Sequence, residues 1–92
     1  METRMEKRME AIQNKLLCHE RLSVREINHI GREGLRGNAR AIFLTALYYL
    51  LEEDDENAFD ILLDEFLESA NEDEVKEAMR WLRLVRKGVA RA

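Results

Sequence analysis

The position of the helix-breaking residues is the feature that most limits how this chain can fold. The 92 residues contain no proline and only four glycines, and three of these, Gly31, Gly34 and Gly37, lie close together. Because proline and glycine are the poorest helix formers, the stretches on both sides of this cluster can each be helical. The sequence therefore predicts an all-α fold with a glycine-rich joint at residues 31–37.

Apolar residues at helical spacing place five helices along the chain. We expect them to begin near residues 2, 24, 39, 58 and 72, and the last to end at Gly88. The cap signals are Ser23 with Glu26, Asn38, and Asn71 with Glu74. The helix from residue 39 is apolar on almost every side, so it belongs in the centre. We expect a single domain over residues 1–92, a compact bundle of four to five short helices with a three-helix core at 38–88.

Length and composition exclude several classes of protein. The longest apolar run, residues 41–51, is much shorter than the roughly 20 residues that a membrane-spanning helix needs. The single cysteine, Cys18, allows no internal disulfide and is typical of a reducing compartment. The first residues are charged, unlike a secretory signal. We therefore expect a cytoplasmic protein without a membrane partner.

Charge is distributed unevenly along the chain, whose net charge is −4. Residues 1–40 carry nine basic and six acidic side chains, residues 52–77 carry one and thirteen, and residues 78–92 carry five and none. In the last predicted helix the acidic residues precede the basic ones, an order that the helix dipole favours. The charges of that helix therefore need no functional explanation.

Two groups of acidic residues lie at positions where negative charge destabilises the predicted helix. The first lies at the C-terminal end of a predicted helix, where the dipole disfavours negative charge; it comprises Glu52, Glu53 and Asp54. The second recurs at i, i+4 and i+8, so that like charges are neighbours; it comprises Asp60, Asp64 and Glu68. We interpret both groups as one acidic helical ridge that binds a basic surface of another protein. The alternative is a face kept acidic only for solubility.

The first helix carries an apolar seam suited to association. The seam residues are Met5, Met9, Ile12 and Leu16, with acidic side chains along one flank and basic ones along the other. In a parallel pair the opposite flanks face each other, so residues 1–20 predict a parallel homodimer. The alternative is that the seam packs on its own bundle, because small domains need every apolar face they have.

The glycine-rich joint is interleaved with Arg32, Arg36 and Arg40. Backbone amides of a turn that enters a helix, reinforced by arginines, can bind an anion. The alternative function is therefore a small DNA-binding transcriptional regulator that uses these arginines in a helix-turn-helix. An ordinary loop between helices explains the same residues, and the acidic segment at 52–77 would repel DNA phosphates.

Catalysis has little support in the sequence. No nucleophile stands at a recognisable spacing from a base, so we expect no enzymatic activity and no cofactor. Glu26 and His29 form a single Glu-x-x-His pair, whereas di-iron bundles use two such motifs with further glutamates. A homodimer would double the pair, but we expect no metal site. The leading interpretation is a non-enzymatic protein–protein interaction module, an adaptor or a small inhibitor or regulator.

Overall fold

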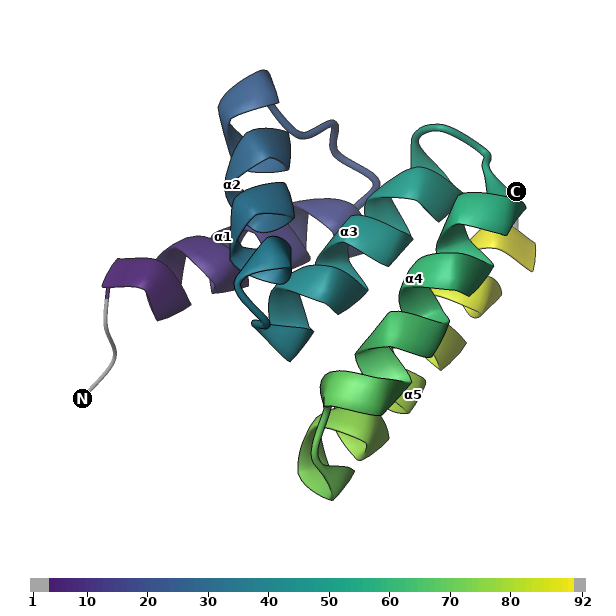
Figure 1. Ribbon diagram of the computed structural model, residues 1–92. Helices are drawn as coiled ribbons and strands as arrows, with labels where there is room; N and C mark the ends of the chain where they lie inside the picture. The colour runs from purple at the N-terminus through teal and green to yellow at the C-terminus, as the bar shows by residue number, and fades with distance from the viewer. Residues whose placement is uncertain (1–3, 91–92) are drawn as a thin grey trace.

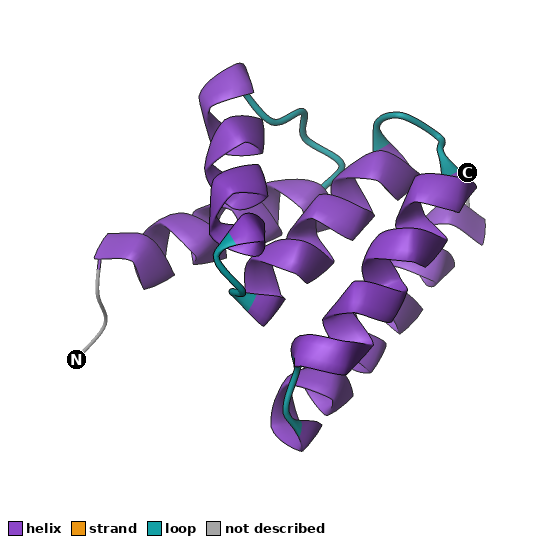
Figure 2. Cartoon of the chain, viewed as in Figure 1, coloured by secondary structure: helices purple, strands orange, loops and turns teal. Residues whose placement is uncertain are grey.

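Five α-helices make up the fold. The structure, a computed structural model, describes the backbone of residues 4–90 and the side chains of residues 7–85. The helices are α1 (Arg4–Leu17), α2 (Val24–Leu35), α3 (Ala39–Leu51), α4 (Glu56–Ser69) and α5 (Glu72–Ala90). Short loops join them, and no strand occurs among the described residues (Figure 2). The predicted all-α bundle is therefore confirmed.

Helix α3 lies at the centre of the molecule (Figure 1). It packs most extensively against α4 and α2, and it also contacts α1 and α5. Its buried residues are Ala39, Ala41, Ile42, Phe43, Leu44, Ala46 and Leu47. A helix that is apolar around most of its circumference is stable in water only when other helices cover it. The central position expected from the sequence follows from this constraint.

The core draws side chains from all five helices. Phe43 of α3 stacks on Phe66 of α4, with ring centroids 5.2 Å apart, while α1 and α2 contribute Met9, Ile12, Leu16 and Ile30. The core therefore extends beyond the expected 38–88 segment. The radius of gyration of 12.3 Å equals that of a compact domain of this length, about 12 Å.

The glycine-rich joint is shorter than the sequence predicts. Gly31 and Gly34 lie inside α2, and only Gly37, with φ of +92°, leaves the helical conformation. The N–H groups of Gly37 and Asn38 donate to the carbonyls of Gly34 and Glu33, both at 3.0 Å, which is the hydrogen-bond pattern of a Schellman helix end. The joint at 31–37 is thus corrected to a tight turn after α2.

Gly34 faces α3, since a Cβ there would lie 3.4 Å from Cγ1 of Ile42, at the near limit of ordinary van der Waals contact. Helix α2 continues through Gly31 and Gly34 although glycine is a poor helix former. At the other end of the chain, α5 continues through Gly88 to Ala90, so the expected end at Gly88 is also corrected.

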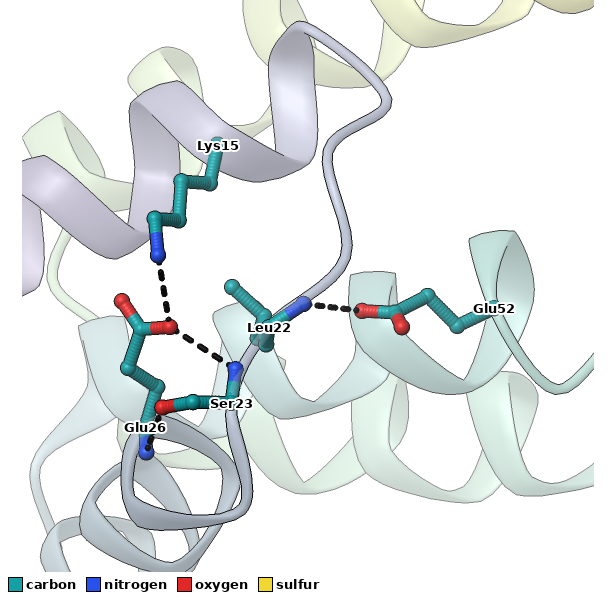
Figure 3. A network of polar contacts seen from close by, with 5 residues as sticks. All are labelled: Lys15, Leu22, Ser23, Glu26 and Glu52. Carbon is teal, nitrogen blue, oxygen red and sulfur yellow. Dashed lines mark hydrogen bonds and ion pairs between the residues drawn. The ribbon is translucent and has the colours of Figure 1, made fainter.

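A polar network holds the loop between α1 and α2 (Figure 3). Glu26 accepts hydrogen bonds from Nζ of Lys15 at 2.9 Å and from the N–H of Ser23 at 2.8 Å, while the Ser23 hydroxyl accepts from the N–H of Glu26. The predicted capping box at Ser23 is therefore present. The buried Leu22 donates its N–H to Glu52 at the end of α3, so the network links α1, α2 and α3.

We predict that Glu26→Ala destabilises the protein by about 1–2 kcal/mol at neutral pH, through loss of the capping and Lys15 bonds. Burial raises the pKa of Glu26, but the hydrogen bonds from Ser23 and Lys15 outweigh it and hold that pKa below its ordinary value of 4.5. The carboxylate thus stabilises the fold above pH 4.5 and ceases to do so as the pH falls through the lowered pKa.

Urea unfolding at about pH 6 and about pH 3 measures this loss for Glu26→Ala, with the exposed Glu10→Ala as control. The difference between wild type and Glu26→Ala should shrink at the lower pH. An equal difference at both pH values would contradict the assigned role.

Two glycine substitutions should act in opposite directions. Gly31→Ala should stabilise the protein by about 0.5–1 kcal/mol, because alanine is the better helix former and its Cβ would meet no atom within 4 Å. Gly37→Ala should cost about 1–2 kcal/mol, because alanine resists a positive φ. Thermal unfolding measures the stability of both variants relative to wild type. Stabilisation by Gly37→Ala would contradict the observed turn.

Candidate functional site

The first acidic group, at the end of α3, takes part in the local structure. Glu52 is half-buried and accepts the hydrogen bond from Leu22 at 3.1 Å. Asp54 adopts a positive φ of 52°, a conformation that Asp tolerates better than most residues. The next residue, Asp55, caps α4 by accepting the N–H of Ala58 at 3.0 Å. These contacts give much of the acidic run a role in ending α3 and beginning α4.

Glu53, the remaining member of this group, accepts a hydrogen bond of 2.6 Å from the hydroxyl of Tyr48. This bond holds the proton on the phenol and, with burial and the adjacent carboxylates, raises the pKa of Tyr48 to about 12. The carboxylate of Glu53 thereby gains a neutral donor near the C-terminal end of α3, where the helix dipole disfavours it.

The second acidic group has no such contacts. Asp60, Asp64 and Glu68, here termed the acidic line, are all exposed on α4. Among the side chains that the structure describes, none forms a hydrogen bond or ion pair with them, and the last turn of α4 has no basic residue. Their mutual repulsion, a few tenths of a kcal/mol per i, i+4 pair, is therefore not offset within the described chain.

Two exposed apolar side chains lie on the same helix. Ile61 is 63% exposed and Leu67 is 45% exposed. At about 100° per residue, they flank the acidic line on opposite sides. The apolar spacing of residues 58–70 predicts Leu67 on the buried stripe of this helix, and its exposure corrects that prediction. Ile61 was not recognised as part of the site, although its place outside the stripe of Phe59, Leu62 and Phe66 is the signal that identifies it.

The predicted association seam lies inside the molecule. Met9, Ile12 and Leu16 are at most 2% exposed and belong to the core of their own chain, while the side chain of Met5 lies outside the described residues. This arrangement corresponds to the alternative in which the seam packs on its own bundle. A second copy could reach these three side chains only if α1 left the bundle, and the parallel homodimer stays a prediction without structural support.

The three predicted anion-binding arginines are not brought together. Arg40 turns toward α1 and donates two hydrogen bonds, at 3.2 and 3.0 Å, to Oε1 of the buried Gln13. Arg32 and Arg36 instead line a hollow between α1 and α2. The helix-turn-helix interpretation also requires an exposed reading helix, whereas α3 lies at the centre of the fold. DNA binding stays untested, and the position of α3 argues against its acting as a reading helix.

Neither a cluster of metal ligands nor a membrane-spanning helix occurs among the residues that the structure describes. Within the described residues, no group of three or more histidine, cysteine, aspartate or glutamate side chains is arranged to hold a metal ion. Glu26 of the Glu-x-x-His pair is occupied by Lys15 and Ser23. No helix in the described part of the chain has both the length and the apolar character needed to cross a membrane.

Comparison with known proteins identifies no relative: the chain matches no protein-family model, no curated protein and no solved structure.

We predict that Glu53→Gln lowers the pKa of Tyr48 from about 12 toward the ordinary value of 10.0, because the carboxylate acceptor and its charge are both removed. A Tyr49→Phe background leaves Tyr48 as the single tyrosine, and alkaline absorbance titration then reports its ionisation. Glu56→Gln, which removes an exposed carboxylate without a contact to Tyr48, is the control. An unchanged pKa in Glu53→Gln would refute the assigned hydrogen bond.

Proposed function

We propose that the protein is a non-enzymatic interaction module, an adaptor or a small inhibitor or regulator, that binds a basic partner protein through the outer face of α4. The observation that carries the proposal is the acidic line of Asp60, Asp64 and Glu68, which is exposed and without a compensating basic residue in the described structure. Sequence choices that oppose the stability of their own element often mark function.

The chemistry of this face defines the kind of partner. Three carboxylates in line match lysines or arginines spaced about one helical turn apart, and charge pairing of this type speeds and orients encounter. Ile61 and Leu67 add apolar contact on both sides, which supplies the desolvated part of an interface. The best-fitting partner surface is therefore a basic ridge with apolar margins, such as one face of an amphipathic helix.

The size of the face points to a modest interface. A helix of 14 residues is roughly 21 Å long, and one face of it is smaller than the roughly 800 Å² per partner of a standard stable complex. Binding through α4 alone should therefore be transient and sensitive to salt. Such behaviour suits a regulator that has to release its target.

Solubility explains the acidic line less well. Carboxylates keep a protein soluble wherever they are exposed, and the first turn of α5 already carries Glu72, Asp73 and Glu74 where the helix dipole favours them. Solubility alone gives no reason to align further carboxylates where they repel one another. A basic partner that neutralises the line removes this repulsion on binding.

Neutralising the acidic line should separate stability from binding. We predict that the triple variant Asp60→Asn, Asp64→Asn, Glu68→Gln is more stable than wild type by about 0.5–1 kcal/mol, because two like-charge pairs are removed. The same variant should lose partner proteins that the wild type captures from a lysate of its source cell at low salt. Urea unfolding and mass spectrometry of the captured proteins measure the two effects.

The matched control is Glu72→Gln, Asp73→Asn, Glu77→Gln, which removes the same charge from exposed positions of α5. This control should be slightly destabilised, because it loses negative charge near a helix N-terminus, and it should keep the partner. Equal capture by wild type and both triple variants would show that the acidic line does not bind.

A further inference from the structure

A basic hollow lies between α1 and α2, two helices on the side of α3 away from α4 (Figure 1). Its volume is about 320 Å³. The residues that line it are Arg8, Arg25, Asn28, His29, Arg32, Glu33 and Arg36. All except Arg8 come from α2 or from its C-cap Arg36, at spacings of three and four residues that place them on one face of the helix. The hollow is thus built from one face of α2 and a single arginine of α1.

The charges around the hollow are unbalanced. Four guanidinium groups face one carboxylate, that of the buried Glu33, whose Oε1 lies 3.5 Å from Nη1 of Arg36. Among the side chains that the structure describes, Arg8, Arg25 and Arg32 have neither a hydrogen bond nor an ion pair. After Glu33 is paired with Arg36, three arginines therefore still face the hollow without an anionic partner among the described side chains.

His29 marks the centre of this cluster. Its Nε2 atom is buried and has no hydrogen-bond partner among the described residues. The charged groups that influence it are Arg8, Arg32 and Glu33; burial first, and then Arg8, lower the pKa of its imidazole. Because Nε2 is closed to solvent, the imidazole borders the hollow through its other ring atoms.

We propose that the basic hollow binds a small anion that carries one or two phosphate groups, with Arg8 and Arg32 contacting the phosphate oxygens beside the His29 ring. Guanidinium groups pair with phosphate oxygens through charge-assisted hydrogen bonds. Arg25 lies at one end of the row on α2 and the Arg36–Glu33 pair at the other, so Arg25 is placed to contact a second phosphate. This site is independent of the partner face on α4.

The dimensions favour a small ligand over nucleic acid. The volume lies at the lower end of the roughly 300–1,000 Å³ range of ligand pockets, a size that admits a compact anion, whereas a DNA-binding module contacts its duplex over a broad exposed surface. The exposed acidic line on α4 would also repel a long polyanion that extended past the hollow. The same arginines that suggested DNA binding thus fit a compact phosphate compound better.

Nuclear magnetic resonance titration of the full chain with inorganic phosphate, and separately with pyrophosphate, tests the proposal. Saturable shifts should appear at His29 and Asn28, and bound phosphate should raise the pKa of the His29 imidazole, because a dianion favours its protonated form. Sodium chloride at matched ionic strength should produce neither effect. Identical shifts with chloride would overturn the proposal.

Two double variants locate the binding. Arg8→Gln with Arg32→Gln should weaken phosphate binding at least about tenfold, whereas Arg80→Gln with Arg83→Gln, which removes the same charge from exposed positions of α5, should leave it unchanged. Both variants should retain the helical circular dichroism of the wild type, because all four side chains are exposed. Equal weakening by the two variants would overturn the proposal.

A short DNA duplex provides the last comparison. If the duplex shifted His29 while inorganic phosphate and pyrophosphate did not, the hollow would belong to an extended nucleic-acid surface and the small-ligand proposal would fail. We expect the reverse order, with pyrophosphate binding more tightly than the duplex at the same salt concentration.

Discussion

Burial of α3 is the constraint on which the rest of this fold depends. A 13-residue helix with seven buried side chains can exist in water only if other helices enclose it, and here α1 and α2 cover one side while α4 and α5 cover the other (Figure 1). Helix α2 packs against α3, and Glu52 links the α1–α2 loop to the end of α3 through its hydrogen bond from Leu22. Since the charged residues of the covering helices cannot enter this core without a large penalty, they are driven to two outer surfaces.

Most of the fold could be predicted from patterns among residues that are close together in the sequence. The helix caps at Ser23, Asn38 and Asn71 are present, because a capping side chain bonds to backbone only three residues away and its signal is complete within the sequence. The prediction of a glycine-rich joint at residues 31–37 was wrong because it depends on contacts between helices, which are not visible in the local sequence. A glycine inside a helix costs roughly 1 kcal/mol, a penalty that is small beside the burial of α2 side chains such as Ile30 against the rest of the core. Such a contact has no signature within α2 itself.

The two charged surfaces also differ in how far they could be predicted from the sequence. The acidic line was found from sequence because its members lie on one helix, where i, i+4 spacing alone makes them neighbours. The basic hollow was missed because Arg8 reaches it from α1, and Arg40, which was expected there, is drawn to Gln13 instead. The roles of Glu52 and Glu53 were likewise hidden: the donor to Glu52 is the N–H of Leu22, 30 residues earlier in the chain.

Helix α3 separates the acidic surface on α4 from the basic hollow between α1 and α2. The net charge of the chain therefore says little about what either surface can bind. The molecule measures 36 × 27 × 24 Å, which is several times the Debye length of about 8 Å at physiological ionic strength. A charged group that approaches one surface is therefore screened from the charges on the opposite side of the core. A basic partner that binds at α4 as proposed would respond to Asp60, Asp64 and Glu68, and an anion in the hollow would respond to Arg8, Arg25 and Arg32, although the chain as a whole carries −4. The apolar centre thus does more than stabilise the bundle, since it keeps two surfaces of opposite charge far enough apart to attract different ligands.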